Sequence, residues 1–383
     1  MRHHQYNANF KFVLNPIDFN KYTDKAVLQY CLGATMYMPG NQDFFPSIMN
    51  RKFPGLTSMV MCFEDACKEE DVPAAEENVI FFLNALCDEM DRGTLSYDDI
   101  PLIFVRVRNL EQFHHFANMI DKRVLKVFTG FNFPKFNGEN ADKYFGHLLH
   151  LNRKFGEIIY GMPILEDEKM AYCETRIAEL RDIAKIIDQY KDIVLNVRVG
   201  ATDFSSYFGV RRGIDYTIYD ILPVRDCLAD ILNTFARGVD YTISGPVWEY
   251  FLANKEMKFQ ELIDPKFNRS LLAKQPIVND AIDGLLRELV LDRANGFVGK
   301  TCIHPTHIKY INAMQCVIRE EYEDAQQILD TSGGVIKSAN ANKMNEIKPH
   351  TSWAAKLLCR AKAYGVIENE VCYFKLFKGC CND

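Results

Sequence analysis

Charged side chains follow several apolar runs of this chain, each at the point where a run ends. They are Glu64, Asp65, Arg106, Glu166 and Asp203. An ionisable group at the end of a buried strand is costly unless it is paired or binds an ion. We therefore interpret these residues as one shared polar site. For any single residue, the alternative of a run that simply ends in solvent stays open.

Glu166 and Asp203 follow neighbouring runs, so their carboxylates could converge on one hard cation. Two carboxylates without imidazole or thiolate favour Mg²⁺, or else Mn²⁺, over Zn²⁺ or Cu²⁺. Such an ion would polarise a substrate carbonyl and stabilise an enolate. Arg106 could clamp a substrate carboxylate through paired hydrogen bonds. An ion pair of Arg106 with Glu64 or Asp65 is the plainer interpretation, and both can hold together.

The elements that must position these residues are eight short apolar runs, which alternate with stretches of helical period. The runs are 35–38, 58–63, 102–107, 127–133, 158–165, 193–199, 241–244 and 300–303. Eight strand-helix units in roughly 270 residues predict an α/β fold, a (β/α)₈ TIM barrel. A doubly wound open sheet is the alternative. In such a barrel the active site lies at the carboxyl ends of the strands.

Three regions follow from this interpretation. We expect an N-terminal extension over residues 1–30, a barrel over 31–312 that carries the catalytic site, and a C-terminal helical region over 313–383. No internal repeat beyond the strand-helix period is visible, and no Gly/Ser or Pro-rich linker divides the chain. The C-terminal region is therefore predicted to be an appendage of the barrel.

The composition excludes several classes of protein. The chain has 383 residues, of which 48% are hydrophobic and 25% charged, with a net charge of -6. That balance offers no basic footprint for nucleic acid or for an anionic membrane surface. The chain has no run of 18 or more apolar residues and no secretory leader, so we expect a cytoplasmic protein. Its twelve cysteines, including Cys380 and Cys381, are scattered without a C-x-x-C pair, which predicts reduced thiols and no structural zinc.

Two basic motifs are candidate phosphate sites. Residues 294–301 (ANGFVGKT) fit a loosened phosphate loop, but a helical stretch precedes them and a strand follows, which is the reverse of the required context. Arg211 and Arg212 follow Asp203 on the expected catalytic face and could hold a phosphate or a second carboxylate. A solvated loop is the alternative for this pair.

The strand-end motifs resemble those of one superfamily in order and spacing. They are 64–66 (EDA), 106–107 (RV), 134–135 (PK), 164–166 (ILE), 200–204 (GATDF) and 296–305 (GFVGKTCIHP). The chain resembles the citrate lyase beta subunit group of the HpcH/HpaI aldolase superfamily, from about Ala34 to Asn312. These relatives are Mg²⁺-dependent carbon-carbon lyases on a TIM barrel.

The resemblance implies a role for each matched residue. Glu166 and Asp203 would be the metal ligands, Arg106 would bind a keto-acid carboxylate, and Glu64 with Asp65 would handle protons or support the ligands. The resemblance also implies a homo-oligomer, a trimer or hexamer. Residues expected to contact substrate are Arg106, Pro134, Lys135, Ala201, Thr202, Ser244 and His304.

Departures from the relatives concern the surroundings of the substrate. Ala34-Thr35 stands where relatives usually carry Arg-Ser, which weakens the case for a coenzyme A thioester. Cys62-Phe63 replaces a common Asp-Leu, and the stretch from Arg198 to Trp248 is divergent. We predict a Mg²⁺-dependent lyase or aldolase that acts on a keto acid or an acyl thioester through a metal-stabilised enolate. The alternative is a barrel that has kept the scaffold and serves as a binding or assembly subunit.

Overall fold

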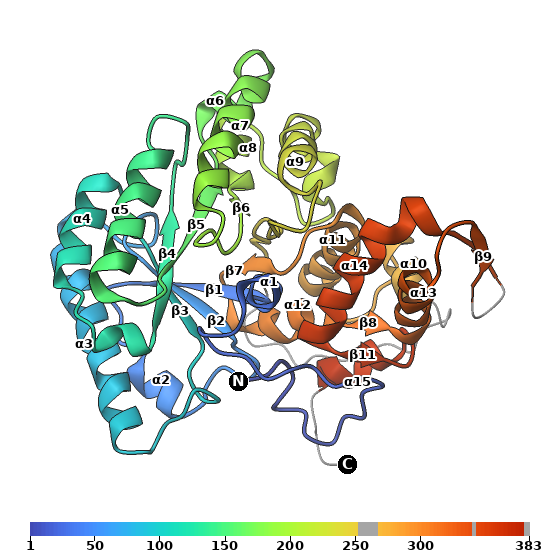
Figure 1. The fold of residues 1–383 in the computed structure, drawn as a ribbon, viewed down its shortest axis with the longest axis horizontal. Coiled ribbons are helices and arrows are strands. Elements are labelled where there is room, and N and C mark those ends of the chain that lie inside the picture. The colour runs from blue at the N-terminus through green and yellow to red at the C-terminus, as the bar shows by residue number, and fades with distance from the viewer. Residues whose placement is uncertain (252–266, 339–341, 379–383) are drawn as a thin grey trace.

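A curled parallel sheet forms the centre of the protein (Figure 1). The computed structural model describes residues 1–251, 267–338 and 342–378. In this part the sheet has seven strands in the order β6-β5-β4-β3-β2-β1-β7. Their bounds are β1 (Ala34–Pro39), β2 (Ser58–Cys62), β3 (Leu102–Arg106), β4 (Phe128–Phe133), β5 (Tyr160–Leu165), β6 (Arg198–Val199) and β7 (Lys300–Cys302). Every residue of β2, β3, β4 and β5 is buried, as expected for parallel strands covered on both faces.

Residues 241–245 join the two edges of this sheet and close it into a barrel. Isolated parallel bridges link Val197 to Ile243 and Gly245 to Lys300. The Val197 amide donates to Thr242 over 2.9 Å, and the Thr301 amide donates to Gly245 over 3.0 Å. The predicted barrel is thus confirmed. The predicted strand 241–244 occupies its expected place, but it pairs only through single bridges and not as a regular strand.

Helices surround the barrel and connect its strands. They are α1 (Lys25–Leu28), α2 (Phe45–Met49), α3 (Val72–Asp91), α4 (Leu110–Met119), α5 (Ala141–Phe155), α6 (Glu168–Ala171), α7 (Cys173–Ile187), α8 (Ala201–Tyr207), α9 (Leu222–Phe235), α10 (Phe267–Leu272), α11 (Asp280–Asn295) and α12 (Ile308–Met314). Short 3₁₀ helices are η1 (Glu69–Asp71), η2 (Val124–Lys126), η3 (Asp188–Tyr190), η4 (Ile218–Asp220) and η5 (Pro305–His307). In α3 the buried residues Val79, Phe82, Leu83 and Leu86 recur at helical spacing, so one face packs against the barrel.

The C-terminal region forms a small unit beside the barrel, at the right of Figure 1. Its elements are β8 (Val317–Ile318), α13 (Arg319–Asp330), β9 (Val335–Lys337), β10 (Met344–Glu346), α14 (Ile347–Tyr364), β11 (Val366–Ile367) and α15 (Cys372–Lys378). The Tyr364 hydroxyl accepts a hydrogen bond from the Gly33 amide over 2.9 Å, which ties α14 to the segment that precedes β1. Leu14 of the N-terminal segment bridges to Val366. The domain limits at residues 30 and 312 stay predictions.

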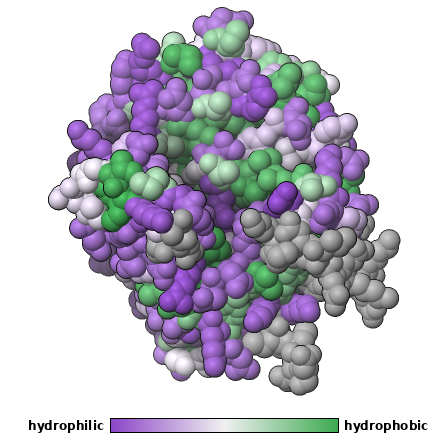
Figure 2. Space-filling model, turned by 90° about the vertical axis from the view of Figure 1, so that its right-hand side faces the viewer, coloured by the Kyte–Doolittle hydropathy of each residue, from purple (hydrophilic) through white to green (hydrophobic). Residues whose placement is uncertain are grey.

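The face of the molecule in Figure 2 is mainly hydrophilic. The face in Figure 2 carries scattered hydrophobic residues and is hollowed near its middle. Among the helices of the described residues, none combines the length and the apolar content that a bilayer crossing requires. Cys380 and Cys381 lie outside the described residues.

Candidate active site

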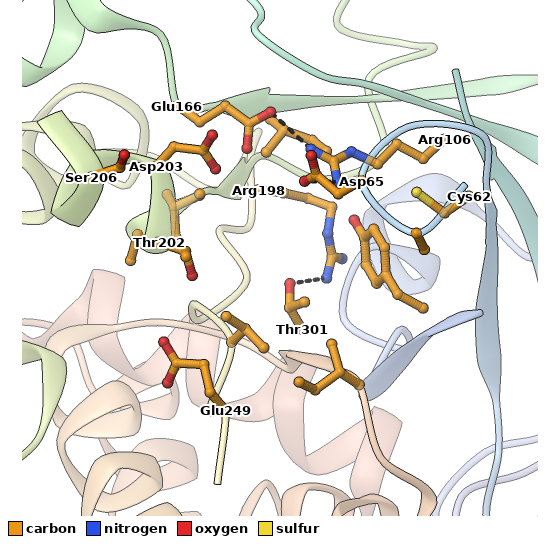
Figure 3. A pocket seen from close by; sticks show the side chains of 18 residues that line it. Cys62, Asp65, Arg106, Glu166, Arg198, Thr202, Asp203, Ser206, Glu249 and Thr301 are labelled. Carbon is orange, nitrogen blue, oxygen red and sulfur yellow. Dashed lines mark hydrogen bonds and ion pairs between the residues drawn. The ribbon is translucent and has the colours of Figure 1, made fainter. Parts of the chain in front are cut away.

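A cavity of about 570 Å³ opens at the carboxyl ends of the barrel strands (Figure 3). Strands on different sides of the barrel supply its walls, among them Tyr37 of β1, Arg106 of β3, Arg198 of β6 and Thr301 of β7. Glu166, which directly follows β5, and Asp203, in the first turn of α8, line the same cavity. The predicted residues Arg106, Glu166 and Asp203 therefore meet where a barrel of this kind places its active site.

Arg106, the last residue of β3, holds three carboxylates together. Its Nη2 lies 2.5 Å from Glu64 Oε2 and 3.1 Å from Glu166 Oε1, and its Nη1 lies 2.9 Å from Asp65 Oδ2. The plainer interpretation of Arg106, an ion pair with Glu64 and Asp65, is thus confirmed. The guanidinium also fixes one oxygen of the predicted metal ligand Glu166.

Lys135, in the turn after β4, is the second cation of the site. Its φ of 47° is a left-handed value that residues with a side chain rarely adopt. This backbone lets its amide donate to Glu166 Oε1 over 3.0 Å. Its ammonium forms an ion pair with Asp203 Oδ1 and lies 3.7 Å from Glu166 Oε1 and 3.8 Å from Glu64 Oε1. Four carboxyl groups thus share two cations.

The remaining oxygens of Glu166 and Asp203 face one point beside Gly200. A Cβ built on Gly200 would lie 2.2 Å from Glu166 Oε2 and 3.1 Å from Asp203 Oδ2. A glycine is therefore needed here because the two carboxylates occupy the space that a side chain would take. An ion at about 2.1 Å from two oxygens needs them within roughly 4 Å of each other. Both oxygens border the same point, as a shared ion would require.

The donor set suits a hard divalent cation. The described residues contain no group of three or more His, Cys, Asp or Glu side chains arranged for a metal. Mg²⁺ is often held by only one or two carboxylates, and it keeps waters and substrate oxygens as further ligands. The two carboxylate oxygens of Glu166 and Asp203 fit that pattern.

Burial and neighbouring charges shift the pKa values of the carboxyl groups in different directions. Burial raises the pKa of Glu166 to about 7, with the Arg106 guanidinium opposing the shift and Asp203 adding to it. Burial also raises the pKa of Glu64 against the effect of Arg106. For Asp65 the balance is reversed: burial opposes ionisation, but the charge and hydrogen bond of Arg106 lower its pKa below the ordinary value. Arg106 therefore holds Asp65, which lines the cavity, in its ionised form.

The other residues predicted to contact substrate divide into two groups. Ala201 and Thr202, at the start of α8, line the cavity. Pro134 precedes Lys135 and does not line it. Ser244 is fully buried, and its hydroxyl donates to Asn196 Oδ1 over 2.8 Å.

His304 also lies outside the cavity wall. Its ring stacks on Phe251 with centroids 4.1 Å apart, and its Nδ1 lies 2.7 Å from Thr306 Oγ1. Contacts of Pro134, Ser244 and His304 with a substrate stay predictions.

Arg212 is engaged in a buried ion network and not in a solvated loop. It forms ion pairs with Glu249 and Glu288, and its Nη2 donates to Val247 over 2.8 Å. The alternative of a solvated loop was wrong for Arg212, because these acids pair with it in the protein interior. Arg211 is exposed. In the same network Lys300 Nζ lies 2.8 Å from Glu288 and 2.7 Å from Asp292, so the lysine of the loosened phosphate loop is buried and paired.

Arg198 is a site residue that was not predicted from the sequence. It lies within an apolar run, at the start of β6, and its side chain lines the cavity. A charge inside an otherwise apolar strand was the signal that could have identified it.

Comparisons with known proteins agree with this picture. A family model described as C-C bond lyase of the TIM-barrel fold matches residues 26–366. The structure is similar to the protein CitE from Mycobacterium tuberculosis in complex with magnesium, acetoacetate and coenzyme A, with 15% identity and a TM-score of 0.50 over 87% of this chain and 99% of that chain. A malate synthase of Haloferax volcanii, as a lead(II) complex, matches at 13% identity and a TM-score of 0.48, over 72% of this chain and 70% of its own.

A citrate lyase beta subunit of M. tuberculosis, complexed with oxaloacetate and magnesium, matches at 16% identity and a TM-score of 0.43, over 73% of this chain and 95% of that chain. A comparison with curated proteins gives no match. The resemblance predicted from the sequence is confirmed at the level of the family and of the barrel fold.

Proposed function

The chain belongs to the family of C-C bond lyases of the TIM-barrel fold, and from this premise we propose that it is a Mg²⁺-dependent lyase that cleaves, or in reverse forms, a carbon-carbon bond next to a carbonyl. Mn²⁺ is the alternative ion. The observation that carries the proposal is the pair of oxygens, Glu166 Oε2 and Asp203 Oδ2, that face one point beside Gly200. The proposed substrate class is a keto acid or the corresponding hydroxy acid, and the acyl thioester alternative depends on coenzyme A use.

Glu166 and Asp203 would hold the ion. When bound, Mg²⁺ supplies a Lewis acid that polarises a carbonyl and offsets negative charge on its oxygen. Arg106 and Lys135 fix the other oxygens of the two ligands, so each carboxylate is oriented before the ion arrives. Arg106 Nη1 has one carboxylate partner and a second hydrogen, which we assign to the substrate carboxylate.

Asp65 is suited to accept the proton in the cleavage direction. It is held ionised by Arg106 and lines the cavity. The hydroxyl proton of the substrate passes to Asp65, and the O–H electron pair forms the new carbonyl. The carbon-carbon bond breaks, and its electron pair moves to the enolate of the departing fragment. That carbon then takes the proton from Asp65, so one proton has moved from oxygen to carbon.

The test is a screen of keto acids and acyl thioesters for Mg²⁺-dependent cleavage, together with Asp203→Ala. We expect the variant to lose Mg²⁺ binding in calorimetry while its circular dichroism stays that of the wild type. Asp226→Ala, at an exposed position, is the control. Unchanged Mg²⁺ affinity in Asp203→Ala would contradict the ligand assignment.

The same experiment separates the lyase from a binding or assembly subunit. A subunit that has only kept the scaffold would show no Mg²⁺-dependent turnover of any substrate in the screen. The trimeric or hexameric state is likewise a proposal, which light scattering tests. The cytoplasmic location stays a prediction.

A further inference from the structure

Arg198 lines the active-site cavity (Figure 3), and the hydrogen-bond partners of its guanidinium are neutral hydroxyl groups. Its side chain is fully buried, with 1% exposure. Its Nη2 donates to Thr301 Oγ1 over 2.7 Å, and its Nη1 lies 3.3 Å from both Thr35 Oγ1 and Ser244 Oγ. The guanidinium also lies 5.6 Å from the centre of the Tyr37 ring. These contacts orient the guanidinium without neutralising it.

The other buried arginines of the described residues have acidic partners. Arg106 pairs with three carboxylates, Arg176 with Asp230, and Arg212 with Glu249 and Glu288. Within residues 1–251, 267–338 and 342–378, no carboxylate lies within ion-pair distance of Arg198, and its Nε has no hydrogen-bond partner. A buried charge without a counter-charge is costly, and arginine keeps its charge in proteins. An anionic ligand would supply what the protein lacks here.

The position of Arg198 fits one end of a bound substrate. Gly200, beside which the free oxygens of Glu166 and Asp203 meet, follows two residues later, and both residues line the same cavity. Two residues along the chain span at most about 7 Å, so the backbones of Arg198 and Gly200 lie close together. A small ligand can therefore reach both places at once.

We propose that Arg198 binds an anionic oxygen group of the substrate, a carboxylate or a phosphate, at the end remote from the carbonyl. The inference rests on the proposed function, which determines the end of the substrate that faces Glu166 and Asp203. It deepens that function by assigning the substrate class: an acid with two anionic groups. Three carboxylates already offset the charge of Arg106. Arg198 is therefore the guanidinium that can pair with the second anionic group of the substrate.

The test compares ligands with one and with two anionic groups. Calorimetry with Mg²⁺ should show that wild-type protein binds oxaloacetate more tightly than pyruvate. In Arg198→Met we expect oxaloacetate affinity to fall by about 10- to 100-fold, because a charged hydrogen bond is lost. Affinity for pyruvate and Mg²⁺ should stay within about twofold. Arg198→Lys should retain part of the preference, and Arg211→Met, on the exposed loop, is the matched control.

Malonate and inorganic phosphate, each without Mg²⁺, test Arg198 independently of the lyase reaction. Wild-type protein should be stabilised in thermal melts by malonate if the group is a carboxylate, or by phosphate if it is a phosphate, and Arg198→Met should not. If keto acids do not bind with Mg²⁺ at all, the proposed function fails while these melts still decide the role of Arg198.

Three results overturn the inference. One is an unchanged oxaloacetate affinity in Arg198→Met, another is an equal loss for pyruvate, and the third is a wild type that neither prefers the dianion nor responds to malonate or phosphate. Should Arg198→Met fail to fold, Thr301→Val removes the hydroxyl that orients the guanidinium. We expect that variant to lose about 3- to 10-fold in oxaloacetate affinity and none for pyruvate.

Discussion

Replacing Gly200 by alanine should destroy the metal site through one methyl group. The new Cβ would lie 2.2 Å from Glu166 Oε2, 2.5 Å from Glu166 Cβ and 3.1 Å from Asp203 Oδ2. Rotation of the Glu166 side chain can move its oxygen but not its Cβ, so the backbone of one residue must also shift. The φ of Gly200 is -101°, which lies outside the left-handed region that favours glycine. Any effect therefore comes from the contacts.

The size of the effect follows from these distances. Ordinary contact begins near 3.4 Å, so Glu166 Oε2 must move by about 1 Å. Mg²⁺ demands near-ideal distances of about 2.1 Å, and a displacement of this size removes Glu166 as a ligand. We expect Mg²⁺ affinity to fall by at least about 100-fold. The free energy of unfolding should fall by about 1 to 3 kcal/mol because of the overpacking.

Calorimetric titration with Mg²⁺, alongside a thermal melt, measures both quantities. Gly213→Ala is the matched control, since a Cβ there meets only Tyr216 at an ordinary 3.5 Å. A folded Gly200→Ala protein with wild-type Mg²⁺ affinity would refute the reasoning, because the point beside Gly200 would then not be where the ion lies.

Two further predictions concern stability. Glu288→Gln should lower the free energy of unfolding by about 3 to 5 kcal/mol in urea, since it leaves buried Lys300 underpaired, whereas Glu323→Gln, at an exposed pair, should cost less than about 1 kcal/mol. Burial lowers the pKa of His4 and of His307 to about 4, so only the unfolded chain takes up these protons just below about pH 6.5. Stability should thus be full above pH 6.5 and fall by up to about 3 kcal/mol per histidine towards pH 4. An equal urea midpoint at pH 7 and pH 5 would contradict this prediction. So would a loss of stability between these pH values that is as large in His307→Asn as in the wild type.

The residues at the strand ends could be predicted from the sequence. Parallel strands of one barrel open at the same end, so Arg106, Glu166 and Asp203 had to lie near each other once the runs were identified. Asp203 nevertheless lies in the first turn of α8, not at the end of β6. The apolar run predicted the strand. The residue at which the strand ends and the helix begins depends on backbone pairing with the neighbouring strands.

The sequence by itself determined the barrel, its order of strands and the acidic character of its open end, because hydrophobic period and strand-end chemistry are local properties of the chain. Only the tertiary structure decided which charges are paired. Arg212 is neutralised by acids 37 and 76 residues away, whereas in the described part of the chain the guanidinium of Arg198 has hydroxyl partners and lies near a ring. The physical reason is that the electrostatic state of a buried side chain depends on neighbours brought close by barrel closure, and spacing along the chain does not encode them.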